Sequence, residues 1–201
     1  MREFGSYAVL RDDFRRPDES PLANRLGWNG NMVSTDSDLA LTSNALVAAG
    51  ADRSAAYTYT LADCEATIHV QTSDSNLKYL FVRAQDVDTT GLDGYAVVAV
   101  TSTSLRLQRW NNGAATNIGN LGVIPTTAPF EIGIRALGAA LEGYWRAVGG
   151  LWVRYVVATD SAFSSGVSGV RASGPATFQA FWFGAITDNI QPAQVFTGSI
   201  A

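Results

Sequence analysis

Residues 104–113 read SLRLQRWNNG, and this stretch decides the fold. Successive side chains of a β-strand point to opposite faces, so the two leucines share one face while Arg106, Gln108 and Trp110 share the other. The pattern predicts a strand with one face in the core and the other in water. The Asn-Asn-Gly sequence at 111–113 tolerates positive φ and therefore predicts a tight hairpin turn after the strand.

The same period of two continues on both sides of this stretch. Residues 95–100 (YAVVAV) are apolar on both faces, which is typical of a strand buried between two layers. Residues 130–135 (FEIGIR), 141–147 and 151–155 (LWVRY) repeat the alternation, with a Gly-Gly turn before the last of them. Within the stretch 95–157 we therefore expect the last four of these strands, from residue 104 to 155, to form an antiparallel meander joined by short turns.

The rest of the chain predicts an all-β fold without any helix longer than a turn or two. Further strands are expected at 7–10, 39–41, 45–47, 57–61, 64–71, 78–84 and 177–186. A spacing of about ten residues per strand, with turn signals between strands, is typical of a two-sheet sandwich. The Ser- and Gly-rich residues 160–173 are predicted to form a loop. We expect one β-sandwich domain at 12–187, an N-terminal arm with the first strand at 1–11, and a C-terminal tail at 188–201.

Composition excludes several classes of partner. A chain of 201 residues that are 47% hydrophobic can bury one sizeable core. The net charge is −4 and the basic residues are scattered singly, which argues against nucleic acid as a partner. No apolar run is long enough to span a bilayer and no secretory signal pattern is visible, so we expect no membrane partner and folding in a reducing cytosol.

The residue patterns of common enzymes are missing. The single histidine, His69, leaves one candidate base for a catalytic triad, and no Gly-x-Ser-x-Gly elbow accompanies it. One histidine and one cysteine cannot assemble a zinc site, and Cys64 is expected to be a small buried hydrophobe. Phosphate-binding loops of the Walker or dinucleotide type are absent. The sequence thus predicts no enzymatic activity and no cofactor.

Short motifs spread over most of the chain point to a known superfamily. In chain order they are Asp12-Asp13-Phe14-Arg15-Arg16-Pro17-Asp18, Gly27-Trp28, Asn44-Ala45-Leu46, Arg83, Gly94-Tyr95 and Phe163–Val170. This series resembles the laminin-G-like jelly rolls of the concanavalin A-like lectin/glucanase superfamily. The resemblance implies two curved antiparallel sheets packed face to face, with a concave face that receives the ligand in sugar-binding relatives.

The chain departs from this superfamily at two places that bear on function. Its glucanases carry a Glu-x-Asp-x-x-Glu strand motif, which sets nucleophile and acid on one face, and none of the five glutamates here has that spacing. Relatives close with an Asp-Asn-Phe-like strand, whereas this chain has Phe181-Trp182-Phe183-Gly184. The resemblance therefore carries over neither the catalytic pair nor a metal site that relies on that aspartate.

The acidic residues 86–93 allow two interpretations. Asp86, Asp88 and Asp93 offer oxygen ligands around a glycine, as in the first half of a calcium loop. Position twelve of such a loop would be Val97 instead of glutamate, and no helix flanks the segment. We interpret it as a hairpin connection, with calcium binding as the alternative.

Aromatic and planar polar side chains supply the candidate binding site. Seven of them fall on the polar face of the predicted meander: Arg106, Gln108, Trp110, Tyr144, Arg146, Trp152 and Arg154. Flat rings beside hydrogen-bonding groups suit stacking on a sugar, and unpaired guanidinium groups would be costly in a dry interior, so we expect an open face. The alternative is that the second sheet or the aromatic closing strand covers these residues. Trp28 and Trp182 are expected in the core.

Together these features predict a non-enzymatic structural or adhesion module of a bacteriophage virion, as a tail protein or a capsid-surface decoration. It would bind carbohydrate weakly, contact other virion or surface proteins, and form an oligomer or part of a larger assembly. The alternative is a bacterial carbohydrate-binding or glycosidase-like domain, at the cell surface or secreted, that is separated from its signal or catalytic partner.

Overall fold

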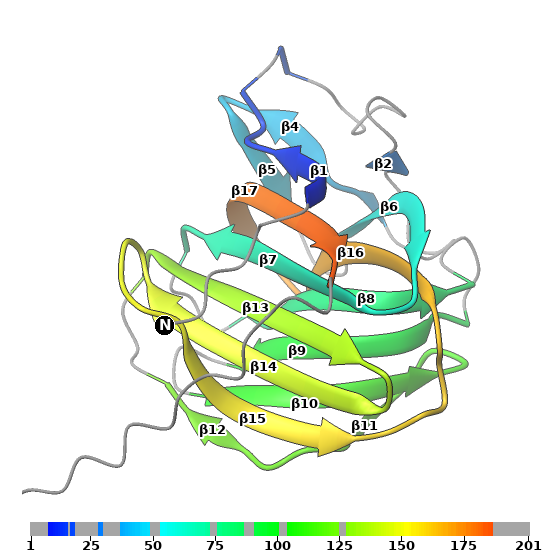
Figure 1. The fold of residues 1–201 in the computed structure, drawn as a ribbon. Coiled ribbons are helices and arrows are strands. Elements are labelled where there is room, and N and C mark those ends of the chain that lie inside the picture. The colour runs from blue at the N-terminus through cyan, green and yellow to red at the C-terminus, as the bar shows by residue number, and fades with distance from the viewer. Residues whose placement is uncertain are drawn as a thin grey trace, which may run out of the picture.

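The computed structural model describes residues 8–15, 17–18, 28–29, 37–48, 53–72, 76–86, 91–100, 104–124 and 128–186. Within these ranges the chain forms strands and connections (Figure 1). No helix with the length and hydrophobicity needed to cross a membrane occurs in this part of the chain. The predicted tail at 188–201 and most of the predicted N-terminal arm lie outside the described residues.

The first layer is an eight-stranded sheet. In spatial order its main path is β15 (Val153–Thr159), β14 (Ala140–Ala147), β13 (Phe130–Leu137), β7 (Cys64–Val70), β17 (Ala176–Ala185), β5 (Ala45–Ala48) and β4 (Ala40–Thr42), and β1 (Ala8–Asp12) also pairs with β17. All of its neighbours are antiparallel. The first strand therefore belongs to the sandwich.

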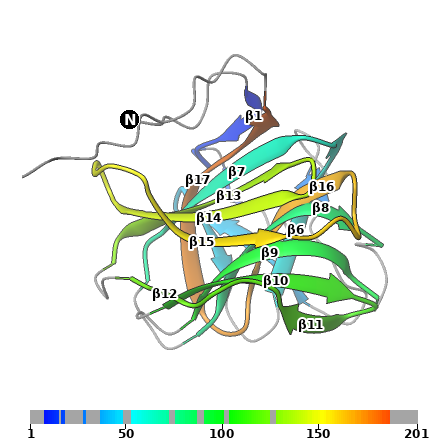
Figure 2. The same cartoon turned by 60° about the horizontal axis from the view of Figure 1, so that its bottom comes forward.

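The second layer is a nine-stranded sheet that packs against the first (Figure 2). Its main path is β11 (Ala114–Asn117), β10 (Ser104–Asn111), β9 (Asp93–Val100), β8 (Lys78–Gln85), β16 (Gly166–Ala172), β6 (Arg53–Leu61) and β2 (Trp28–Asn29), with β12 (Gly122–Val123) beside β10 and β3 (Ser37–Asp38) beside β6. Only the short β3 pairs in parallel among these strands.

The core lies between the inner faces of the two sheets. Strand β7 contributes Cys64 and Ile68, β10 contributes Leu105 and Leu107, and all four side chains are buried. Cys64 is fully buried, which confirms its expected role as a buried hydrophobe, and this burial raises the pKa of its thiol to about 12. The alternation of the sequence therefore identified the inner face of these strands correctly.

The predicted four-stranded meander is wrong. Strands β9 and β10 lie in the nine-stranded sheet, whereas β13, β14 and β15 lie in the eight-stranded sheet. The alternation of apolar and polar residues indicates a strand and its buried face, but it says nothing about which sheet the strand joins. The change of sheet occurs between β12, which still pairs with β10 in the nine-stranded sheet, and β13, which begins at Phe130 in the eight-stranded sheet.

The predicted loop at 160–173 is also partly wrong, because Gly166–Ala172 forms β16 between β8 and β6. Its small residues fit this central position: Ser168 is buried and donates its hydroxyl to the Phe81 carbonyl oxygen at 2.6 Å. Glycine is depleted in strands and serine is common in turns, and this is why composition indicated a loop.

The hairpin turn predicted at 111–113 is confirmed, because Asn112 and Gly113 connect β10 to β11 with positive φ. Ser43 and Asn44 connect β4 to β5 in the same way. The Asp12-x-Phe14 motif is a local cap, because the Asp12 carboxylate accepts the Phe14 N–H at 2.8 Å and directs the Phe14 ring into the core.

Candidate functional site

The predicted site residues of β10 lie on the outer face of the nine-stranded sheet. Register places Arg106 opposite Val98, Gln108 opposite Ala96 and Trp110 opposite Gly94 on β9. Gly94 has a φ of 139°, and a Cβ added there would lie 2.8 Å from the Ala84 Cα. Small residues on β9 thus leave room for side chains that reach across it from both neighbouring strands.

An aromatic cluster fills that space. Tyr79 and Phe81 on β8 stack at 6.0 Å, and their rings meet the Trp110 indole edge-on at 5.8 and 5.6 Å. The Arg171 guanidinium of β16 lies over the Trp110 ring, with its Cζ 5.3 Å from the centroid. Trp110 is consequently only 8% exposed. The prediction that Trp110 is openly exposed is wrong, since Tyr79 and Phe81 of β8 and Arg171 of β16 enclose it.

The Trp110 Nε1 donor and the Gln108 Oε1 acceptor are both buried as atoms, and neither has a hydrogen-bond partner among the described residues. The Gln108 amide nitrogen donates to Asn117 Oδ1 on β11 at 3.0 Å, which fixes the direction of the side chain. We call Arg106, Gln108, Trp110, Asn117 and Arg171 the indole face. A donor and an acceptor two residues apart, both unsatisfied, are unusual for buried groups.

The other predicted site residues lie on the outer face of the opposite sheet. Tyr144 and Arg146 belong to β14 and Arg154 to β15, and register pairs Tyr144 with Arg154. Both donate to Glu142: the Tyr144 hydroxyl at 2.5 Å and the Arg154 Nη1 at 2.6 Å. Arg135 adds an ion pair at 3.8 Å. The Glu142 carboxylate is therefore the centre of a surface ion-pair network.

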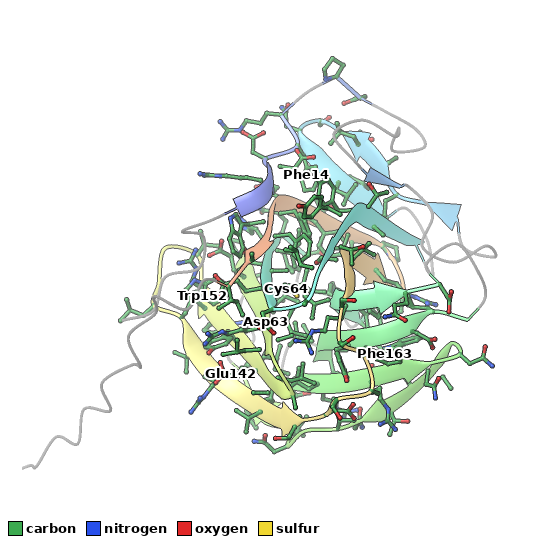
Figure 3. The ribbon with its side chains drawn as sticks, turned by 45° about the vertical axis from the view of Figure 1, so that its right-hand side comes forward. Phe14, Asp63, Cys64, Glu142, Trp152 and Phe163 are labelled. Atoms are coloured by element: carbon green, nitrogen blue, oxygen red, sulfur yellow. The ribbon has the colours of Figure 1, made fainter. Side chains whose placement is uncertain are left out.

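Trp152 precedes β15 on the same side of the molecule, where Figure 3 shows it with Glu142. Its half-buried ring lies 4.4 Å from the Arg146 Cζ, a cation–π contact. Arg146 also donates its Nε to Glu131 on β13. Arg146 thereby joins the indole of Trp152 to the neighbouring strand.

The seven predicted residues therefore form two groups and not one open face. Arg106, Gln108 and Trp110 share the outer face of the nine-stranded sheet, whereas Tyr144, Arg146, Trp152 and Arg154 lie across the sandwich. The single-face prediction depended on the meander and is wrong for the same reason. Trp182 is buried as expected, although on the outer face of the eight-stranded sheet, and the Trp28 side chain lies outside the described residues.

Sequence reasoning missed the partners that come from other strands. Tyr79, Phe81 and Arg171 pack against Trp110 of the indole face. Glu131 pairs with Arg146, and His69 lies opposite Glu131. These residues fall in predicted strands or in the supposed 160–173 loop, and their neighbours were unknown without the cross-strand register. Alternation alone could identify only that they point outward.

Acidic residues do not gather into a recognisable metal site in the part of the chain that the structure describes. Asp93 Oδ1 accepts the Asn112 N–H at 2.5 Å, so this aspartate caps the β10–β11 turn. Asp88, the middle residue of the predicted calcium alternative, lies outside the described residues.

Two glutamates on the outer face of the eight-stranded sheet are held by arginines. Glu131 bonds Arg146, and Glu142 bonds Arg154. These two ion pairs join β14 to β13 on one side and to β15 on the other, and they fix the side chains on this face of the sheet.

A different polar cluster ties together one end of the sandwich. Arg83 is 2% exposed and donates to the carbonyl oxygens of Ala62, Gly138 and Phe163 at 2.7, 2.7 and 3.1 Å, and to Asp63 Oδ1 at 3.1 Å. Its φ of 51° turns the backbone at a bulge in β8. One side chain thus joins three separate connections.

The neighbouring Tyr95 and Asp160 extend this cluster. The Tyr95 hydroxyl donates to Asp160 Oδ1 at 2.7 Å and accepts the Phe163 N–H at 3.0 Å, and Arg109 Nη1 donates to Asp160 Oδ2 at 2.9 Å. Burial, together with the bond to Asp160, raises the pKa of Tyr95 to about 12. We call Arg83, Asp63, Tyr95, Arg109 and Asp160 the arginine end.

Solved structures with this fold include several that are known for binding carbohydrate. A carbohydrate-binding module, CBM66, from Bacillus subtilis has 20% identity and a TM-score of 0.63, over 79% of this chain and 96% of that chain. The CBM2 module of the evolved Dit of Lactobacillus casei BL23 phage J-1 has 12% identity and a TM-score of 0.59, over 92% and 98%.

A GH43 protein of Bacillus licheniformis, BlXynB, has 13% identity and a TM-score of 0.60, over 88% of this chain but only 39% of that chain. No protein-family model matches the sequence, and a search of curated proteins finds no match. The structural likeness establishes the fold: the chain is a two-sheet antiparallel sandwich of the concanavalin A-like jelly-roll kind, as its motifs predicted.

Proposed function

We propose that the chain is a non-catalytic carbohydrate-binding module and that the indole face is its binding surface. The observation that carries this proposal is the pair of unsatisfied atoms, Trp110 Nε1 and Gln108 Oε1. A sugar hydroxyl group can accept from the one and donate to the other, whereas a purely structural role would leave both atoms at a cost of about 1–3 kcal/mol each.

The surroundings of these two atoms support the same ligand class. Arg106, Asn117 and Arg171 are half-buried or exposed and border the enclosed aromatic cluster. Planar polar groups around aromatic rings match the alternating hydroxyl groups and C–H surfaces of a sugar. Arg171 covers the Trp110 ring, so the ligand would have to displace its guanidinium before it stacks on the indole.

We further propose that this module works in a bacteriophage particle, as part of the tail or on the capsid surface, and contacts other virion proteins there. The support is the phage Dit module, which the chain matches over nearly the whole length of both. The second candidate is a bacterial module attached to a glycosidase, which the GH43 neighbours favour because the chain corresponds to only a part of them. Mass spectrometry of purified particles separates these candidates: peptides of this chain in the particle support the first.

A glycan array followed by calorimetry tests the binding proposal. The purified chain should bind at least one neutral glycan, and Trp110→Phe, which keeps a ring but removes the N–H, should weaken that binding about tenfold. Gln108→Leu should act similarly. Val123→Ala, at a side chain that is 74% exposed on β12, is the matched control and should bind like the unaltered chain. An array without any hit, or equal affinities for all three variants, would contradict the proposal.

A further inference from the structure

A row of polar side chains crosses four adjacent strands on the outer face of the eight-stranded sheet. Register places Arg146 of β14 opposite Glu131 of β13, Glu131 opposite His69 of β7, and His69 opposite Gln179 of β17. Gln71, just after β7, lies beside Gln179. We call these five residues the polar row. Three strand spacings of about 4.8 Å give the row a length of roughly 14 Å.

Internal bonds hold these side chains in place. The Gln71 amide nitrogen donates to Gln179 Oε1 at 2.7 Å and lies 3.1 Å from His69 Nε2, and the Arg146 Nε donates to Glu131 Oε2. Every member is half-buried, so the long side chains have limited freedom while their outer atoms still reach solvent. A ligand that binds here meets an ordered surface and does not have to immobilise it.

The remaining polar atoms of the row alternate in character. Among the described residues, no further hydrogen bond engages Glu131 Oε1, Gln71 Oε1 or the Gln179 amide nitrogen. Together with the outer guanidinium nitrogens of Arg146, these atoms give the row alternating hydrogen-bond donors and acceptors. A hydroxyl group can both donate and accept, so the hydroxyl groups of one ligand can bond to both kinds of atom.

The charge of the row favours a neutral ligand. Arg146 and Glu131 form an ion pair, so their charges cancel. Burial lowers the pKa of His69, while Glu131 acts to raise it and Arg146 to lower it further, so the imidazole is neutral at pH 7. A neutral imidazole can donate from one nitrogen and accept at the other.

Trp152 closes one end of the row. The Arg146 Cζ lies 4.4 Å from the centroid of its half-buried ring, so the indole is in contact with the last donor of the row. An aromatic ring at the end of a ladder of donors and acceptors provides a stacking surface for the terminal ring of an oligosaccharide.

From these features we infer that the polar row and Trp152 form a second binding site, for a neutral oligosaccharide of several units, on the face of the sandwich opposite the indole face. This inference rests on the proposed carbohydrate function but uses none of the residues that carry it. Two sites on opposite faces make the chain bivalent, so one copy can bridge two glycan chains, and several copies on one assembly gain avidity.

Calorimetry with an oligosaccharide hit from the array, on the full chain, tests the inference. The unaltered chain should bind two equivalents. Gln71→Ala combined with Gln179→Ala should remove one equivalent and leave the affinity of the other within twofold. Trp110→Phe should weaken only the other site. Val157→Thr, an exposed position on β15 away from the row, is the matched control, and thermal melts establish that each variant is folded.

The possible failures of the two proposals are distinguishable. If the chain binds only one equivalent, and Trp110→Phe weakens it while the glutamine variants do not, the second site is wrong and the proposed function stands. If the chain binds only one equivalent and only the glutamine variants remove it, the polar row is the binding site and the proposal for the indole face is wrong. An absence of binding to every glycan on the array overturns both. If the glutamine variants unfold, Trp152→Leu and His69→Asn replace them, with the same loss of one equivalent expected.

Discussion

The arginine end and the indole face use similar side chains in opposite ways. At the arginine end, Arg83 donates four hydrogen bonds and Asp160 accepts three, so these buried groups are fully engaged with protein partners. At the indole face, Trp110 is buried and Gln108 is half-buried, and among the described residues they keep a donor and an acceptor without a hydrogen-bond partner. The first arrangement is what a structural cluster requires, and the second is what a ligand could complete.

This difference gives a way to separate stability from binding by substitution. A group whose bonds are all internal should cost stability when it is replaced, whatever replaces it. A group that has an unsatisfied donor or acceptor should tolerate a replacement of similar shape, because the replacement breaks no hydrogen bond in the protein without ligand. The following variants test this contrast.

The largest effect is expected for Arg83→Met. Methionine fills part of the space but leaves three carbonyl oxygens and Asp63 without their donor, so the free energy of unfolding should fall by about 3–5 kcal/mol. Chemical denaturation measures this loss. Arg154→Met is the matched control: Arg154 is 57% exposed, and its ion pair with Glu142 should contribute less than about 1 kcal/mol. Equal losses for both arginines would remove the distinction between buried and exposed pairs.

Asp160→Asn should have the next largest effect and should depend on pH. Burial opposes ionisation of Asp160, but hydrogen bonds from Ala162 and Tyr95 and the charge of Arg109 outweigh it and lower the pKa of this carboxyl group. A lowered pKa gives stability that is present above pH 4 and is lost as the pH falls through the folded-state pKa. The variant should therefore lose about 2 kcal/mol at pH 7 and little near pH 2, as measured by denaturation at both values.

The sequence predicted the strands much better than their arrangement. Leu105 and Leu107 were assigned to the core correctly because alternation reports which face of a strand is apolar. Trp110 was placed on the outer face, also correctly, but its exposure was wrong because Tyr79 and Arg171 come from strands whose register is not written in local sequence. Exposure is decided by neighbours across the sheet.

The candidate site shows the same limit more strongly. Arg106 and Arg146 follow the same alternating pattern but lie on opposite sides of the sandwich, since the connection before β13 crosses from one sheet to the other. A jelly roll makes such crossings repeatedly, so strands that are consecutive in sequence need not be neighbours. The superfamily motifs predicted the two-sheet fold, but short motifs do not specify which face of which sheet carries the open polar atoms.

Trp110→Phe tests the indole face with a smaller effect on stability. Truncation to alanine would remove a buried ring and cost about 3–5 kcal/mol, which would confound any binding measurement. Phenylalanine keeps contacts with Tyr79 and Phe81 and removes only the unsatisfied N–H and part of the ring, so the free energy of unfolding should fall by about 1 kcal/mol. Thermal melts with and without a glycan ligand check both parts. The ligand should raise the melting temperature of the unaltered chain more than that of the variant.

Gln108→Leu should have the smallest effect on stability. The side chain gives up one exposed hydrogen bond to Asn117 and one unsatisfied acceptor, while leucine adds apolar contact with the aromatic cluster. These changes oppose one another, so the free energy of unfolding should stay within about 0.5 kcal/mol of the unaltered chain. Glycan affinity should nevertheless fall by about tenfold, because a sugar hydroxyl group loses the acceptor that orients it.

Gln108→Glu is the informative companion, since a carboxylate keeps an acceptor at the same position. If Gln108→Leu lowers the glycan affinity and Gln108→Glu retains it, the hydrogen-bond acceptor at this position is the feature that the ligand recognises. A loss of stability above 2 kcal/mol for the leucine variant would show instead that Gln108 belongs with the structural residues of the arginine end.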